Sequence, residues 1–136
     1  MATSVFERPR GIASLGLCWL TVAAAAAPTP RNYLIVTADV FAGSAPLAQL
    51  VAGRTALGFN VTVYPVAAGT TKETIKAYIA SLWGTPAAPE FILLVGDTPA
   101  VPHWTGGGSK HAPTDLPYAC MDAGDDWHPD IAIGRF

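Results

Sequence analysis

The chain has 136 residues, a formal net charge of −2, and 51% hydrophobic residues against 13% charged ones. This length suits one domain, and the apolar excess excludes a solvated disordered tail, which needs low hydrophobicity and high net charge. The eight Lys and Arg residues are scattered and form no basic patch, so we expect no nucleic-acid partner.

The first 27 residues have the pattern of a secretory signal peptide. Arg8 and Arg10 precede an uncharged apolar stretch that ends in an alanine run. A basic start, an apolar middle and small residues at the end are typical of such peptides. We therefore predict a signal peptide over residues 1–27, a mature chain over residues 28–136, a secreted or extracytoplasmic location, and no membrane contact after cleavage. The alternatives are an uncleaved anchor and a wrongly chosen start codon.

Four short apolar runs predict β-strands. Each run contains β-branched residues, as expected of strands buried in a sheet. The runs cover residues 33–36, 61–64, 91–95 and 131–133. Pro65 closes the second run, and the third run is apolar on both faces, which places it in the middle of a sheet covered by helices.

Apolar residues at helical spacing predict two helices between these strands. The first lies between Pro46 and Gly58, and Gly58 is well placed to cap its end. The second follows a capping box at Thr70 and Glu73 and ends at Gly84. The β-α-β-α-β order indicates a parallel sheet with right-handed crossovers. We predict a three-layer, flavodoxin-like α/β fold with about four mostly parallel strands.

Acidic residues gather where the predicted strands end. Asp39 follows the first strand, Asp97 follows the third, and Asp115 and Asp125 lie in the loop beyond it. Ligands of open parallel sheets bind outside the carboxyl ends of the strands, and calcium prefers several carboxylate oxygens. A calcium site at Asp97, Asp115 and Asp125 is one hypothesis. The other, which the Gly- and Pro-rich context favours, is that these side chains cap turns.

The residues that could form a nucleophilic site are few. Without the signal peptide, Cys120 is the only cysteine, so the mature chain has no internal disulfide. The composition allows a Cys/His dyad of Cys120 with one of His103, His111 and His128. Cys120 does not follow a predicted strand, and a lone cysteine is more typical of a small buried apolar residue. We assign no catalytic residue and no zinc site.

Four stretches carry motifs in a fairly specific order. They are Tyr33–Thr37 with Gly58–Val63, Thr74–Ile79, Phe91–Asp97 with Val101–Pro102, and Thr114–Phe136, which ends in Pro129-Asp130-Ile131-Ala132-Ile133-Gly134-Arg135-Phe136. In these stretches the chain resembles the amino-terminal half of the gingipain family of cysteine peptidases. The resemblance covers nearly all of the predicted mature chain.

This resemblance implies a caspase-like fold of two side-by-side subdomains, secretion, and an endopeptidase that acts on protein or peptide substrates. It places the catalytic His, in a His-Gly step, and the catalytic Cys in the second subdomain. None of the three His residues here precedes Gly. We therefore expect a non-catalytic first subdomain over residues 28–136, a fragment whose proteolysis needs the downstream His/Cys subdomain.

Two other functions stay open at this stage. The first is a secreted α/β binding module in which Asp39, Asp97 and Asp115 hold a calcium ion. The second is an acid-using hydrolase of flavodoxin-like shape, which would need a paired general acid and base on this chain.

Overall fold

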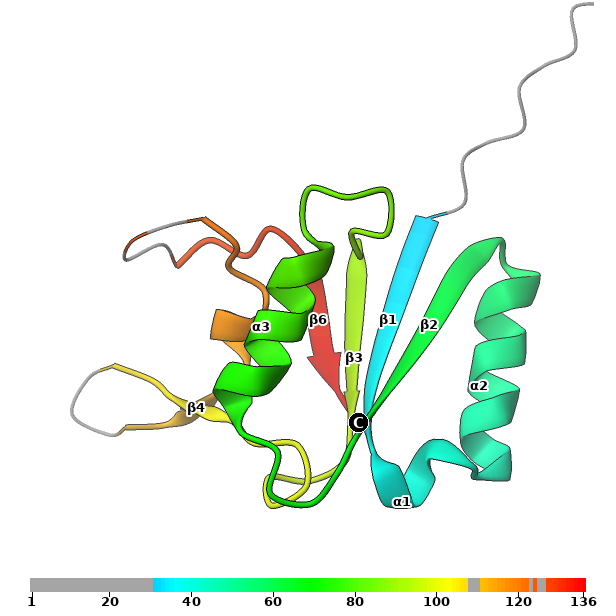
Figure 1. Cartoon of the computed structure of the whole chain (residues 1–136), viewed down its shortest axis with the longest axis horizontal. Coiled ribbons are helices and arrows are strands. Elements are labelled where there is room, and N and C mark those ends of the chain that lie inside the picture. Colours follow the sequence, from blue (N-terminus) through cyan, green and yellow to red (C-terminus); the bar gives the residue numbers. More distant parts are fainter. Residues whose placement is uncertain (1–30, 108–110, 123, 125–126) are drawn as a thin grey trace, which may run out of the picture.

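A four-stranded parallel sheet forms the centre of the protein (Figure 1). The computed structural model describes residues 31–107, 111–122, 124 and 127–136. The strands are β1 (Arg31–Ala38), β2 (Phe59–Val66), β3 (Phe91–Val95) and β6 (Ala132–Arg135), in the order β2-β1-β3-β6. All three neighbouring pairs are parallel, and β3 is an interior strand. The predicted α/β class and parallel sheet are therefore confirmed.

The helices lie on both faces of the sheet. Helices α1 (Asp39–Ala42) and α2 (Ala45–Ala56) follow β1, and α3 (Lys72–Leu82) follows β2. Figure 1 shows α2 and α3 on opposite sides of the strands. Ser44 begins α2, because its side-chain oxygen accepts a hydrogen bond from the backbone N–H of Leu47 at 3.4 Å. The result is the predicted three-layer arrangement.

The long connection from β3 to β6, residues 96–131, is called the excursion, and its described part lies on the α3 side of the sheet. It contains β4 (Trp104–Thr105), β5 (Pro113–Thr114) and the short 3-10 helix η1 (Leu116–Tyr118). The strands β4 and β5 form a small antiparallel ribbon. These elements have two or three residues each, too short for apolar periodicity to reveal, and the sequence predicted a loop here.

The structure corrects several element boundaries. The N-cap of α3 is Thr71, whose hydroxyl accepts from the N–H of Thr74 at 3.2 Å, so the predicted capping box at Thr70 and Glu73 is wrong by one residue. The helix ends at Leu82, with Trp83 as its C-cap and Gly84 next at φ of +75°, so the predicted end of the helix at Gly84 is confirmed. Pro65 lies within β2 and does not end it, because β2 is an edge strand and one side of its backbone needs no partner.

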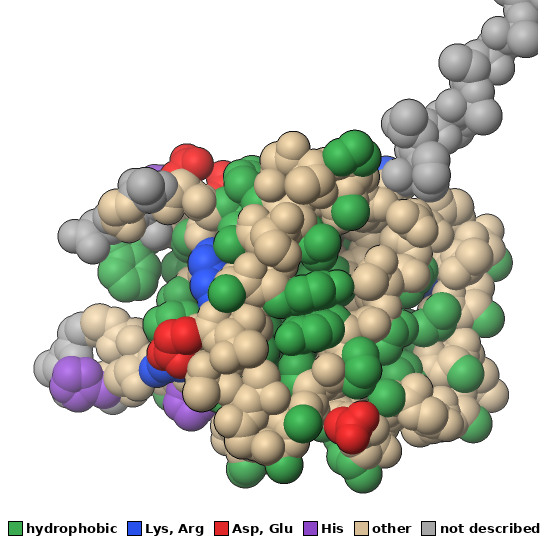
Figure 2. Space-filling model, in the orientation of Figure 1, with side chains coloured by type: hydrophobic (Ala, Val, Ile, Leu, Met, Phe, Trp, Pro, Cys, Tyr) green, Lys and Arg blue, Asp and Glu red, His purple; other side chains and the backbone are tan. Residues whose placement is uncertain are grey.

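The two faces of the sheet are packed unequally. On the α3 face, eleven buried residues form one cluster, with Leu34, Val36 and Leu94 on the strands and Tyr118 and Ile131 on the excursion. On the α2 face, the buried apolar cluster of the described residues consists of Tyr33, Ile35 and Leu47, and the other apolar residues against them are partly exposed. In Figure 2, hydrophobic side chains run through the middle of the displayed face. The core therefore sits mainly between the sheet and the α3 layer.

Candidate functional site

Arg135 connects three segments at the carboxyl edge of the sheet. Its Nε donates to Oδ2 of Asp115 at 2.8 Å, and its Nη2 donates to Oδ1 of the same carboxylate at 2.6 Å. Its Nη1 donates to the carbonyl oxygens of Gly96 at 2.8 Å and Val101 at 2.9 Å. The hydrogen bonds to Asp115 raise the pKa of Arg135, so the guanidinium stays charged. This network fixes the loop after β3 against β6 and the excursion.

Asp97 shapes the turn that follows β3. Its Oδ1 accepts from the backbone N–H of Thr98 at 2.7 Å, and its carbonyl oxygen accepts from the N–H groups of Ala100 and Val101. These are the turn-capping bonds that the sequence offered as the alternative to calcium ligation. Gly96 precedes it with φ of +129°, and a Cβ there would lie 3.3 Å from the Cβ of Ala38. Only glycine suits that conformation.

The structure places the predicted calcium ligands as follows. Asp97 caps its own turn, and Asp115 is held by Arg135 in a pair whose side chains are each 22% exposed. Asp125 lies outside the described residues, and Asp39 stands in the first turn of α1. Among the described residues there is no group of three His, Cys, Asp or Glu side chains able to hold a metal. The calcium site stays a prediction.

Tyr118 supports the same network from the core. It is fully buried, and its hydroxyl donates to the carbonyl oxygen of Pro102 at 2.6 Å. Burial raises the pKa of Tyr118 to about 12, although the charge of Arg135 opposes the shift. The ring of Trp104 contacts it edge to face, with ring centroids 6.1 Å apart. Tyr118 therefore serves as a neutral hydrogen-bond donor that secures the loop after β3.

Cys120 is attached to backbone groups near α3. Its thiol donates to the carbonyl oxygen of Leu116 at 3.4 Å, and its own carbonyl oxygen accepts from the ammonium of Lys76. Burial lowers the pKa of Lys76, while the charges of Cys120 and Asp130 oppose that change. The ammonium also contacts the Sδ atom of Met121 at 3.6 Å. These contacts hold the excursion against α3.

An apolar groove opens on the α2 face near the carboxyl edge. Its volume is about 740 Å³. The lining residues come from β1, α1, α2, β3 and the chain end, and they are Tyr33, Phe41, Ser44, Pro46, Leu47, Leu50, Arg54, Leu93, Val95, Gly96, Asp97 and Phe136. Phe136 is 91% exposed, yet its backbone still pairs with Leu94 and Gly96. Sequence reasoning missed this groove because it depends on which strips of the sheet α2 leaves uncovered.

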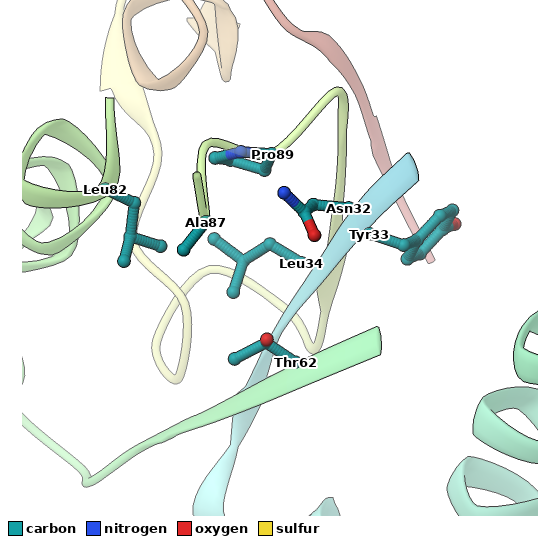
Figure 3. Close-up of a pocket in the computed structure, with 7 residues that line it drawn as sticks. All are labelled: Asn32, Tyr33, Leu34, Thr62, Leu82, Ala87 and Pro89. Atoms are coloured by element: carbon teal, nitrogen blue, oxygen red, sulfur yellow. The ribbon is translucent and has the colours of Figure 1, made fainter. Parts of the chain in front are cut away.

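A second, much smaller pocket lies at the opposite edge of the sheet. Figure 3 shows Asn32, Leu34, Leu82, Ala87 and Pro89 around it, while Tyr33 points away toward the other face. Its volume of about 30 Å³ is room for one or two water molecules. The amide of Asn32 donates to the carbonyl oxygens of Pro86 and Ala88. This small pocket lies between β1, β2, the end of α3 and the segment that follows α3, and the carboxyl edge remains the candidate site.

The fold is an open parallel α/β sheet with its candidate site at the carboxyl edge, and comparison with known proteins names the family. Residues 26–136 match peptidase family C25. The chain belongs to that family.

One solved structure supports the fold. The crystal structure of the Arg-specific cysteine proteinase gingipain R matches with a TM-score of 0.64 and 20% sequence identity, over 79% of this chain and 24% of that one. The chain therefore spans about a quarter of that proteinase. No curated protein sequence matches the chain. The predicted membership of the gingipain family is confirmed.

One further property of the described residues concerns membranes. No helix within residues 31–107, 111–122 and 127–136 is long and apolar enough to cross a bilayer. The predicted signal peptide lies outside the described residues and stays a prediction.

Proposed function

We propose that this chain is the amino-terminal, non-catalytic subdomain of a secreted family C25 cysteine endopeptidase. In that enzyme a thiolate attacks the peptide carbonyl, a His acts as general base and backbone N–H groups hold the oxyanion. This chain contributes scaffold and part of the wall of the substrate cleft. Its partners are the catalytic subdomain and, through it, protein or peptide substrates.

The incompletely covered α2 face is the observation that carries this proposal. A sheet of a globular domain needs a layer packed on each apolar face. Here the α3 layer buries one face of the sheet. On the other face, Leu93 and Val95 of the interior strand β3 stay partly exposed. A larger protein in which a further segment packs on β3 and β6 accounts for this asymmetry.

The contacts of Cys120 also favour a scaffold role. The thiol of Cys120 is directed to the Leu116 carbonyl, and the backbone around it is fixed by Lys76 and Asp130. The carboxyl edge is likewise built from backbone-capping bonds and the pair of Arg135 with Asp115.

A peptidase assay tests this proposal. The purified chain is incubated with unstructured protein and short peptide substrates under reducing conditions, beside the Cys120→Ala variant. We expect no hydrolysis above the level of the variant, because the catalytic His and Cys lie in the other subdomain. Thiol-dependent cleavage by the chain alone that Cys120→Ala abolishes would overturn the non-catalytic assignment.

A further inference from the structure

Two tyrosine rings lie stacked between the edge strand β2 and helix α3. Tyr64 of β2 and Tyr78 of α3 have ring centroids 3.8 Å apart and ring planes inclined by 14°. Aromatic pairs in proteins more often lie offset or edge to face, with centroids about 4.5–7 Å apart. The two phenol rings are therefore unusually close and nearly parallel.

These two residues are also the tyrosines that solvent reaches. The chain has four tyrosines. Tyr33 is 8% exposed and Tyr118 is fully buried. Tyr64 and Tyr78, in contrast, are partly exposed at the border of the buried cluster on the α3 face. An oxidant in solution therefore meets the stacked pair and not the other two phenols.

The elements that carry the rings hold them in place. Tyr64 pairs in register with the buried Val36 of β1. On α3, Ile75 and Ile79 are buried, and Tyr78 follows Ile75 by three residues, so its ring lies on the same side of the helix. Both rings pack against the buried cluster. The stack is thus a fixed part of the fold.

We propose that Tyr64 and Tyr78 form an oxidative crosslinking site that yields an intramolecular dityrosine. The co-reactant is a one-electron oxidant, here a haem peroxidase with hydrogen peroxide. Because the rings are parallel and directly stacked, an ortho carbon of one lies within about 4 Å of an ortho carbon of the other at any rotation in the ring plane, which is van der Waals contact. The two carbons that must bond are therefore already neighbours.

The reaction needs no protein group besides the two phenols. Each phenol loses one electron and one proton to the oxidant, and the two phenoxyl radicals form a bond between their ortho carbons. Each of these carbons then releases its hydrogen as a proton, while each phenolic oxygen takes up a proton, which restores both aromatic rings. The pair loses two hydrogen atoms, and one hydrogen peroxide becomes two water molecules.

The dityrosine ties an edge of the sheet to the helix beside it. Strand β2 is at the end of the strand order, and the new bond closes the loop of residues 64–78 between β2 and α3. Closing a loop covalently lowers the entropy of the unfolded chain. The predicted mature chain has one cysteine and hence no internal disulfide. The crosslink supplies a covalent tie that cysteine pairing does not.

Mild oxidation of the full chain tests the site. The dilute protein is treated with a haem peroxidase and hydrogen peroxide, the monomer is isolated, and its fluorescence, intact mass and peptide map are recorded. We expect the blue fluorescence of dityrosine, a mass lower by two hydrogen atoms, and a crosslinked peptide pair that contains Tyr64 and Tyr78. The crosslinked monomer should unfold at a higher urea concentration than the untreated protein.

Phenylalanine variants assign the bond to this pair. Tyr64→Phe and Tyr78→Phe each remove one phenol but keep the stacked ring, so we expect the fold to be retained. In both variants the fluorescence of the monomer should stay at the level of unoxidised protein. The matched control is Tyr33→Phe, which removes a buried phenol and should leave the yield of the crosslink unchanged.

Three results would overturn the inference. They are a wild-type monomer without dityrosine under conditions that couple free tyrosine, dityrosine confined to covalent dimers, and a crosslinked monomer in Tyr64→Phe or Tyr78→Phe. An unchanged urea midpoint of the crosslinked monomer would contradict its stabilising role. The inference is independent of the proposed function, because the peptidase assay depends on neither tyrosine.

Discussion

Arg135 and Asp115 form a two-pronged ion pair that joins the last strand of the sheet to the excursion beside it. The same guanidinium also binds the carbonyl oxygens of Gly96 and Val101, so one side chain closes the loop after β3. The carboxyl edge of the sheet is thereby fixed by a residue of its own outer strand. The stability of this edge is open to direct measurement.

Arg135→Lys should destabilise the chain by about 2 kcal/mol, since an ammonium cannot make the paired bonds to a carboxylate and reach both carbonyls. The matched control is Glu90→Gln, which breaks the pair of Arg31 with Glu90, where the side chains are 56% and 48% exposed. We expect the control substitution to lower the free energy of unfolding by less than about 1 kcal/mol. Urea unfolding curves give both values. Equal losses for the two variants would contradict the structural role of Arg135.

Gly96→Ala should destabilise the chain by about 1–3 kcal/mol, because φ of +129° is strained for any residue with a Cβ and Ala38 leaves little space. The control is Gly53→Ala in the interior of α2, where a Cβ meets nothing within 4 Å. Alanine is the better helix former, so this change should stabilise by about 0.5–1 kcal/mol. Opposite shifts of the urea midpoint are the expected result. Shifts in the same direction would speak against the described turn.

The stability of the protein should fall at alkaline pH as Tyr118 ionises. Its pKa is raised from 10.0 to about 12, so the folded state holds the proton that the unfolded state releases between these values. Stability from this group is present in full below pH 10 and is lost as pH rises toward 12, by up to about 2 kcal/mol. In Tyr118→Phe the slope of unfolding free energy against pH should be shallower over that range. Identical slopes would rule out a buried, neutral Tyr118.

The calcium hypothesis predicts that Arg135 weakens calcium binding. A cation at Asp97, Asp115 and Asp125 competes with the guanidinium that already holds Asp115. If Asp115 is a ligand, calorimetric titration should give at least threefold tighter calcium binding by Arg135→Met than by the wild-type chain. Asp97→Asn should weaken binding in both backgrounds. The absence of heat and of any rise in Tm with calcium, in wild type and variant alike, would end the hypothesis.

The strands were predictable because burial gives them continuous apolar runs. The interior position of β3 followed from its five apolar residues, and its bounds, Phe91–Val95, agree with the structure. The short helix α1 and the ribbon of β4 and β5 were not predictable, because two to four residues carry no period. Local hydrogen bonds decided between Thr70 and Thr71 as the cap, and the sequence allows both.

The candidate site was predictable only in part. The sequence placed Asp97 correctly at the carboxyl end of β3, since residues after parallel strands meet at that edge. It did not reveal Arg135 as the partner of Asp115, because the two are twenty residues apart and meet only through the register of β6 on β3. The groove was hidden for a similar reason, since it arises from the share of the sheet that α2 leaves uncovered.

The central claim is that this chain forms the first subdomain of a cysteine peptidase. The most direct measurement is the sequence of the messenger RNA beyond the Phe136 codon. The account predicts a reading frame that continues and encodes a His-Gly step and a later Cys. A stop codon there, in a transcript confirmed from both ends, would contradict it.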